Sequence, residues 1–407
     1  MASESSSAVI ELNDADATDT EAPSVTDDTQ EPPPLIMEHG YDIAVKVDAP
    51  IKQLSTLETF VTYRVRCTCA RWESPPFVRR RYNHFKLLHK RLSSSHPLTA
   101  VPPLPPLHSA RQQLDRYSPP FVAVRCLALN AFLDRVAKHP ILTLSEDLKM
   151  FLTTPDEELD KVLKSDTSAL NLWGLSSALY GGGGGGGNKQ TNGARVKDPE
   201  FSSAAEYLAS LQVKLSSLCS LTARLYKGTV TLSNELAGMR RVCDAWSSGG
   251  GGAAAAAAAV SAGSAAASAA RARAPLRYRA TLPLLAAYAG AQADKIRARD
   301  ALHAAHVAGA GPEVHNRLEQ ASEALRADLA DWLPKTRAEI KSALLELADR
   351  QLGAAAASLR GWERALSMAE DDGVVFQTVS RAALSSRHRG DDDSSSASRL
   401  EDVDLSS

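Results

Sequence analysis

The sequence has few cysteines, no long apolar run and no basic residue in its first 34 positions. Its cysteines form no Cys-x-x-Cys pair and join no cluster of histidines. They are Cys67, Cys69, Cys126, Cys219 and Cys243. Five in 407 residues is a small, odd number, which indicates reduced, partly buried thiols in a cytosolic protein. No apolar run reaches the ~20 residues that a helix needs to cross a bilayer.

Motifs of the common enzyme classes are also missing. The sequence contains no Gly-x-x-x-x-Gly-Lys-Ser/Thr, no His-Glu-x-x-His and no Gly-x-Ser-x-Gly. The glycine run 181–187 follows no predicted strand and lacks the Lys-Ser/Thr pair, so it does not cradle a phosphate. The ten histidines are scattered along the chain. We therefore expect a protein without catalytic activity, cofactor or bound metal.

Charge is distributed unevenly along the chain. Residues 1–34 carry nine acidic residues and no base, and residues 391–407 carry six acids and Arg399. The formal net charge of −2 therefore hides a charge of +12 on residues 35–390. A basic body fits an anionic partner, either nucleic acid or a membrane surface, and charge alone does not choose between them. Residues 1–37 and 371–407 are predicted to be disordered acidic tails, and the first lacks the pattern of a signal peptide.

The first ordered region is predicted to begin with strands. Apolar and polar residues alternate over 43–48 and again over 61–69, which predicts two half-buried strands. The first is expected to end at Ala49-Pro50, and the second to carry a basic outer face. A third strand is expected over 77–82, after Ser74-Pro75-Pro76 turns the chain.

Helices are predicted to follow. Asn83 is the expected N-cap of a helix that ends at His96-Pro97. A second helix is expected to start after Ser118-Pro119-Pro120 and to run to about Lys138. Ser145 is expected to cap a third helix that ends at Phe151-Leu152. Between the first two lies a proline-rich connector, residues 101–107, whose prolines favour polyproline II. It is interpreted as a rigid connector, with an SH3 ligand as the alternative.

Three consecutive arginines leave the third predicted strand just before the first helix. Arginine forks bind phosphate oxygens in bidentate fashion, and an aromatic face is a platform for a ring. The run Val78-Arg79-Arg80-Arg81-Tyr82-Asn83-His84-Phe85 offers both. It suits a phosphorylated polyol, and a solvated basic end of a strand is the equally open alternative.

Three motifs in order carry a family resemblance. Arg-Arg-Tyr-Asn-x-Phe is followed by Pro-Pro-Leu-Pro and then by Phe-Val-x-x-Arg. With the order of strands and helices, they resemble the PX (phox homology) domain over residues 38–155. Residues 56–63 and 79–83 are most similar to the sorting nexin 7 and sorting nexin 30 branch. The resemblance implies an α+β fold, a three-stranded antiparallel sheet with helices, that binds phosphatidylinositol 3-phosphate.

The resemblance also implies roles for single residues. The arginine before the tyrosine holds the 3-phosphate in that family, and here it is Arg81. Tyr82 corresponds to the residue that packs against the inositol ring, and Arg125 to the one that holds ring hydroxyls. Leu107 replaces the family's lysine for the 1-phosphate, and Arg111 is the candidate substitute.

Residues 156–197 are predicted to connect two domains. In PX–BAR sorting nexins an amphipathic helix at this place helps insertion into the bilayer, and segment 163–180 resembles it in position and apolar content. Only Lys161 and Lys164 lie near its polar face, so a plain linker stays open as the alternative. The glycines 181–187 are predicted to form a flexible tether.

The pattern from 198 to 370 is helical. Leucines keep a three/four spacing over 208–236, which predicts a long helix with a coiled-coil seam, ending near Trp246. The Gly/Ala-rich stretch 249–270 is interpreted as an insertion or loop, with a helix over its alanine run as the alternative. A second helical region is expected over 271–307, interrupted at Pro275 and Pro283. A third is expected from Pro312 to about Met368, with a kink at Pro334.

Three long helices after a PX-like domain resemble the BAR domain, an all-α three-helix coiled-coil fold that forms curved dimers. Residues 328–332 and 361–363 are similar to positions in the last helix of that family, and a monomeric three-helix bundle is the alternative. The resemblance implies a cytoplasmic protein on the cytosolic face of early endosomes. It implies a role in endosomal sorting and recycling, with autophagy as a further process. A heterodimer with a sorting nexin 4-like protein is expected in preference to a homodimer.

A second class of function stays open: a PX–BAR scaffold that acts mainly through protein contacts, with weak or lost lipid binding. Leu107 favours this scaffold, whereas Arg81, Tyr82 and Arg125 favour the lipid-binding protein. Nucleic-acid binding is not expected, because the basic residues are not interleaved with aromatics in a recognised module.

Overall fold

The computed structural model describes residues 34–54, 59–105, 117–159, 161, 199–249, 253–272, 277–309 and 311–370. The chain divides into two compact units. The first comprises Met1–Thr231 and Ala272–Gly353, and the second comprises Leu232–Arg271 and Ala354–Ser407. The predicted tails, the apolar segment 163–180 and the glycine tether lie outside the described residues. The predicted domain boundaries stay predictions.

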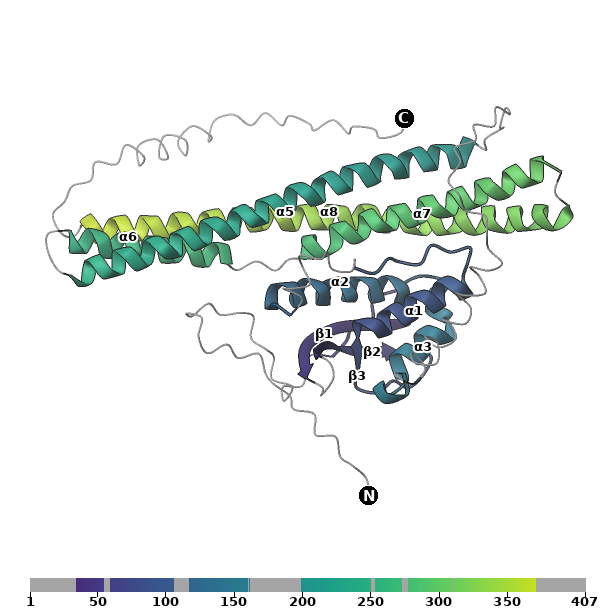
Figure 1. The fold of residues 1–407 in the computed structure, drawn as a ribbon, viewed down its shortest axis with the longest axis horizontal. Coiled ribbons are helices and arrows are strands. Elements are labelled where there is room, and N and C mark those ends of the chain that lie inside the picture. Colours follow the sequence, from purple (N-terminus) through teal and green to yellow (C-terminus); the bar gives the residue numbers. More distant parts are fainter. Residues whose placement is uncertain are drawn as a thin grey trace, which may run out of the picture. The chain divides into compact units, whose positions relative to one another are not determined.

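The sheet of the first unit has the strands that alternation predicted. Strands β1 (Ile43–Leu54), β2 (Thr59–Cys69) and β3 (Val78–Arg81) are antiparallel in the order β1-β2-β3 (Figure 1). The prediction that β1 ends at Ala49-Pro50 is wrong. The register shifts between Asp48 and Ile51, and Ala49 has a φ of 40°. This irregularity accommodates the proline, and pairing with β2 resumes beyond it.

Three helices continue this region: α1 (Tyr82–Ser95), α2 (Pro119–Ala137) and α3 (Glu146–Thr153), with a 3-10 turn η1 (Leu142–Leu144). The predicted cap of α3 is confirmed, because Ser145 Oγ accepts the Asp147 N–H at 3.2 Å. The predicted N-cap of α1 is wrong. The helix begins at Tyr82, and the backbone N–H of Arg81 donates to Nδ1 of His84 at 3.2 Å. Arg81 is therefore the N-cap, and His84 fills the N3 position of a capping box.

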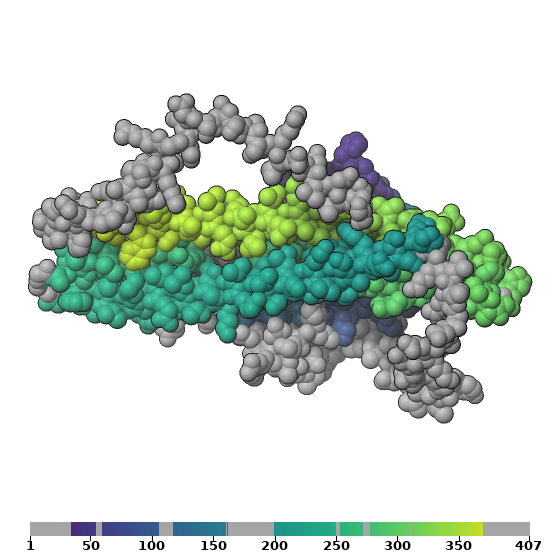
Figure 2. Space-filling model, turned by 90° about the horizontal axis from the view of Figure 1, so that it is seen from above, coloured from purple at the N-terminus to yellow at the C-terminus, as the bar shows by residue number. Residues whose placement is uncertain are grey.

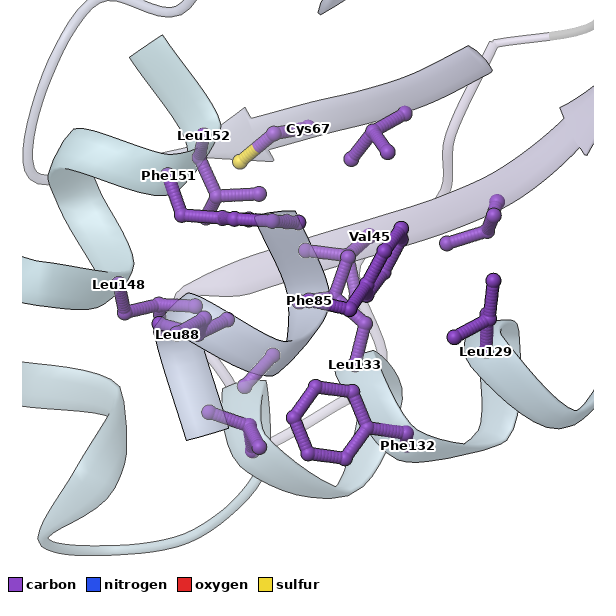
Figure 3. Packing of buried hydrophobic residues seen from close by; sticks show 14 of the residues in the cluster. Val45, Cys67, Phe85, Leu88, Leu129, Phe132, Leu133, Leu148, Phe151 and Leu152 are labelled. Carbon is purple, nitrogen blue, oxygen red and sulfur yellow. The ribbon is translucent and has the colours of Figure 1, made fainter. Parts of the chain in front are cut away.

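Phe85 lies at the centre of the core that joins this sheet to its helices. Its side chain is fully buried, and its ring meets those of Tyr63, Phe132 and Phe151 at centroid distances of 6.5, 6.3 and 4.9 Å. Figure 3 shows it between Val45 of β1 and the helices. Full burial of such a ring contributes about 1.5–3 kcal/mol relative to exposure. The contacts hold α1, α2 and α3 on one face of the sheet.

The long helices α5 (Pro199–Ser248), α7 (Arg277–Val307) and α8 (Pro312–Glu370) confirm the helical pattern of the second half. Figure 2 shows α5 and α8 side by side. Pro283 lies inside α7, so the predicted interruption there is wrong. Leu282 and Leu284 beside it are 1% exposed, and their packing offsets the lost backbone hydrogen bond. Gly309, with a φ of 88°, ends the turn that precedes α8.

The alanine-rich stretch is a helix of the second unit, α6 (Ala254–Ala272), and the prediction of a loop is wrong. Alanine is the strongest helix former, and its small side chain lets helices approach closely. A Cβ on Gly263 would lie 2.4 Å from Cε3 of Trp362, and one on Gly361 would lie 2.4 Å from Cβ of Ala266. The small residues are therefore the contact surface between α6 and α8. None of the described helices is long and apolar enough to cross a bilayer.

Candidate functional site

The three consecutive arginines of β3 have different surroundings. Arg80 points into the core, and its side chain is fully buried. Its Nε donates to the Phe151 carbonyl at 2.8 Å, its Nη1 pairs with Asp156 at 2.6 Å, and its Nη2 donates to the Thr154 carbonyl. Arg80 therefore joins β3 to the end of α3 and is part of the fold rather than of a surface site.

Arg79 and Arg81 lie on the opposite face of β3, as strand alternation requires. Arg79 donates to the Ala49 carbonyl at 3.1 Å and so braces the irregular part of β1. Arg81 pairs across the sheet with Thr62, and its guanidinium lies 4.8 Å from the centroid of the Phe60 ring. Arg81 is half-buried. Of the three arginines, it is the one next to Tyr82 at the start of α1.

Tyr82 and Arg125 lie together, as predicted. The guanidinium carbon of Arg125 is 4.5 Å from the centroid of the Tyr82 ring and 4.7 Å from that of Phe121. The Tyr82 hydroxyl donates to the Pro105 carbonyl at 2.7 Å. Burial raises the pKa of the Tyr82 phenol, which stays neutral, and burial also lowers the pKa of Arg125. The tyrosine is held at its hydroxyl by the proline-rich connector and at its face by α2.

Phe121 is the first residue of the Phe-Val-x-x-Arg motif, and the sequence analysis gave it no role in the site. It lies one turn before Arg125 on α2, and its ring covers the guanidinium. Residues four apart on a helix are neighbours, so this spacing could have revealed the contact. Two rings fix the plane of the fork, and such cation–π contacts contribute about 0.5–2 kcal/mol each. Arg125 is only 9% exposed, so a ligand would reach only part of its fork.

The remaining site residues are not placed by the structure. Arg111 and Leu107 fall in 106–116, outside the described residues. The proposal that Arg111 substitutes for the missing lysine therefore stays a prediction. The structure brings together Tyr82 and Arg125, and it places Arg81 directly before Tyr82 in the chain.

A second candidate surface runs along α8. Four leucines recur at intervals of seven, and each is exposed. They are Leu345 (60%), Leu352 (71%), Leu359 (48%) and Leu366 (43%). A seven-residue apolar repeat is typical of a helix that packs against another helix. On α5 the same spacing gives buried residues at Leu208, Leu215 and Thr222.

A sequence profile described as "PX domain" matches residues 73–155. The chain contains a PX domain. The match includes Arg81, Tyr82 and Arg125, so the candidate site lies within the PX domain. The resemblance first seen in three short motifs is thereby confirmed for this part of the chain.

Relatives of the PX-domain chain are sorting nexins. It is 31% identical over 210 residues to sorting nexin-7 of Mus musculus, covering 51% of this chain and 52% of that protein. It is 32% identical over 209 residues to sorting nexin-30 of Xenopus tropicalis, covering 51% and 45%. The chain thus spans about half the length of the curated relatives it matches. The predicted likeness to this branch is confirmed, and sorting nexins are not enzymes.

A solved structure has a similar fold. The structure titled "The cryo-EM structure of the SNX-BAR Mvp1 tetramer" matches with a TM-score of 0.52 over 79% of this chain and 99% of that chain. At 16% identity this likeness shows the fold alone. The predicted fold class, an α+β PX domain followed by long helices that pack as a BAR-like bundle, is confirmed.

Proposed function

We propose that this chain binds phosphatidylinositol 3-phosphate on the cytosolic face of early endosomes and acts in protein sorting and recycling, with autophagy as a further process. One observation carries the proposal: Tyr82 and Arg125 lie together, and Arg81 directly precedes Tyr82. An aromatic face suits the inositol ring, and guanidinium forks suit phosphate and hydroxyl oxygens. No other residue type offers a fork of this kind.

Each residue has one role in this proposal. Arg81 binds the 3-phosphate, Tyr82 packs against the inositol ring, and Arg125 binds ring hydroxyls. Arg111 takes the place of the lysine that Leu107 replaces. Leu107→Lys should then tighten binding, unless Arg111 already fills the role. In that case Leu107→Lys has no effect and Arg111→Ala weakens binding.

The helices supply the second half of the proposal. The exposed leucines of α8 form a seam that fits another helical chain, and we propose a dimer that senses or bends the membrane. A sorting nexin 4-like protein is the proposed partner in preference to a second copy. Light scattering of the full chain, alone and mixed with that partner, tests this. A monomer in both conditions at micromolar concentration contradicts it.

Liposome flotation tests the lipid half. Vesicles with phosphatidylinositol 3-phosphate should carry the chain upward, and vesicles of equal charge made with phosphatidylserine should carry much less. Such a charge-matched control separates recognition of the headgroup from attraction between a basic body and an anionic surface. Equal flotation with both vesicles contradicts the proposal.

A scaffold that acts through protein contacts is the second candidate. The observation that favours it is the burial of Arg125, which is 9% exposed between two rings. If the guanidinium of Arg125 must be uncovered before a ligand can reach it, the free energy of uncovering it lowers the affinity for that ligand. The scaffold predicts association with the partner chain and no dependence on phosphatidylinositol 3-phosphate in the same flotation experiment.

A further inference from the structure

A buried carboxylate on α8 contacts three other elements of the first unit. Asp328 is 4% exposed. Its Oδ2 accepts the backbone N–H of Ala100 at 3.0 Å and Nε2 of Gln292, on α7, at 3.2 Å. Its Oδ1 lies 3.1 Å from Nε2 of His139, which follows α2. Buried carboxylates are costly unless donors surround them, and Asp328 meets that requirement.

The proton on His139 can be assigned from its other nitrogen. Nδ1 lies 3.1 Å from the backbone nitrogen of Ile141 and 3.2 Å from that of Leu142, and both N–H groups donate to it. Nδ1 therefore carries a lone pair, and Nε2 carries the hydrogen. His139 donates to Asp328, so the carboxylate accepts three hydrogen bonds.

The contact with Ala100 holds the start of the proline-rich connector. The side chain of Ala100 is fully buried in a cluster with residues of α5, α7 and α8, whereas Val101 belongs to the core of the PX domain. Three residues earlier, Nζ of Lys295 donates to the Pro97 carbonyl at 2.6 Å. The chain therefore passes from the helical core into the PX core at Ala100, where helices α7 and α8 hold its backbone.

Pro105, later in the same connector, contacts Tyr82 of the candidate site. The Pro105 carbonyl accepts the Tyr82 hydroxyl, whose ring lies against Arg125. Between Ala100 and Pro105 the chain contains Pro102 and Pro103, whose rings fix φ, and Pro102 and Pro105 are buried. Fixed φ angles at successive prolines restrict how this segment can bend. A displacement at Ala100 is therefore passed on to Tyr82.

We propose that Asp328 is a positioning residue for the phosphoinositide pocket, acting through the backbone of Ala100 and the proline-rich connector on Tyr82. This inference rests on the proposed lipid binding. It ties the ring platform of the PX domain to the last helix, the one that carries the exposed leucine seam.

Binding of a soluble short-chain phosphatidylinositol 3-phosphate to the full chain tests the inference by calorimetry. Asp328→Asn keeps the shape but turns an acceptor into a group that also donates, so Ala100 is held less well. Affinity should fall about threefold or more, the size expected for loss of a coupling contact. Glu339→Gln is the matched control. It removes the ion pair between Arg135 of α2 and Glu339 of α8, in the same unit, and does not touch the connector.

The outcomes separate the inference from the proposed function. No binding by the unaltered chain overturns both. Binding that Arg81→Ala abolishes, with Asp328→Asn equal to the unaltered chain, overturns the inference alone. Equal losses for Asp328→Asn and Glu339→Gln also overturn it, because they indicate a general effect of domain packing.

A measurement on the unaltered chain covers the case in which Asp328→Asn does not fold. Hydrogen exchange at the Ala100 amide should slow when the short-chain lipid binds, although this amide lies at the far end of the connector from Tyr82. The internal control is the Ile141 amide, whose N–H donates to His139. Its exchange rate should change less. Unchanged exchange at Ala100 overturns the inference.

Discussion

The guanidinium of Arg125 lies over the ring of Tyr82, with 4.5 Å between the guanidinium carbon and the ring centroid. Phe121 covers the same group at 4.7 Å. A fork held between two rings keeps its orientation before any ligand arrives, so less side-chain entropy is lost on binding. The same rings leave Arg125 only 9% exposed, which limits how many of its N–H groups a ligand can reach. We therefore expect affinity for a phosphoinositide to depend on Arg81 more than on Arg125.

Arg80 should matter for stability and not for lipid recognition. Arg80→Gln removes a fully buried charge and leaves the carbonyls of Phe151 and Thr154 without their donor. The free energy of unfolding should fall by on the order of 3 kcal/mol, as for a broken buried pair. Urea denaturation followed by circular dichroism measures it. Arg79→Gln removes the same charge from the same strand and should lower the free energy of unfolding by less than Arg80→Gln does. Equal losses for the two variants would contradict the structural role of Arg80.

Two glycines of α8 should respond to alanine in opposite directions. Gly361→Ala places a Cβ 2.4 Å from Cβ of Ala266 on α6, and such overpacking costs about 1–3 kcal/mol. Gly353→Ala meets nothing within 4 Å and gains about 1 kcal/mol of helix propensity. The midpoint temperature of thermal unfolding should therefore fall for Gly361→Ala and rise for Gly353→Ala. An increase for both would show that α6 and α8 are not in close contact.

The leucine seam of α8 should control association. Leu352→Glu introduces a charge at a residue that is 71% exposed, so the fold of a single chain should tolerate it. A dimer that buries this position should dissociate, because an unpaired buried charge is strongly unfavourable. Sedimentation with the sorting nexin 4-like partner measures it. Val307→Glu, at a residue 70% exposed outside the seam, is the matched control. If both variants still assemble, the seam is not the interface.

Local signals account for what the sequence predicted well. Alternation located β2, and Ser145 followed by an apolar helix located α3, because both features depend on neighbouring residues alone. The α6 helix and the passage of β1 beyond Pro50 were mispredicted. Helix α6 had a local signal, the high helix propensity of alanine, which the assignment of a loop set aside. The passage of β1 beyond Pro50 depends on pairing with β2, which no local pattern reports.

The candidate site divides in the same way. Arg81, Tyr82 and Arg125 were identified from motifs. The separation of Arg80 from Arg81 follows from strand alternation and was within reach of the sequence. The contact between Ala100 and Asp328 could not be predicted from the sequence, because it joins positions 228 residues apart.

Replacing Arg81 tests the central claim most directly. Arg81→Ala removes a charge-assisted contact worth about 1.5–3 kcal/mol, so binding to liposomes with phosphatidylinositol 3-phosphate should fall roughly tenfold or more. Lys149→Ala removes an equal charge from α3, at a side chain 45% exposed, and should bind like the unaltered chain. Flotation of the three proteins on the same vesicles gives the comparison. Arg81→Ala binding as well as Lys149→Ala would contradict the assignment of the pocket.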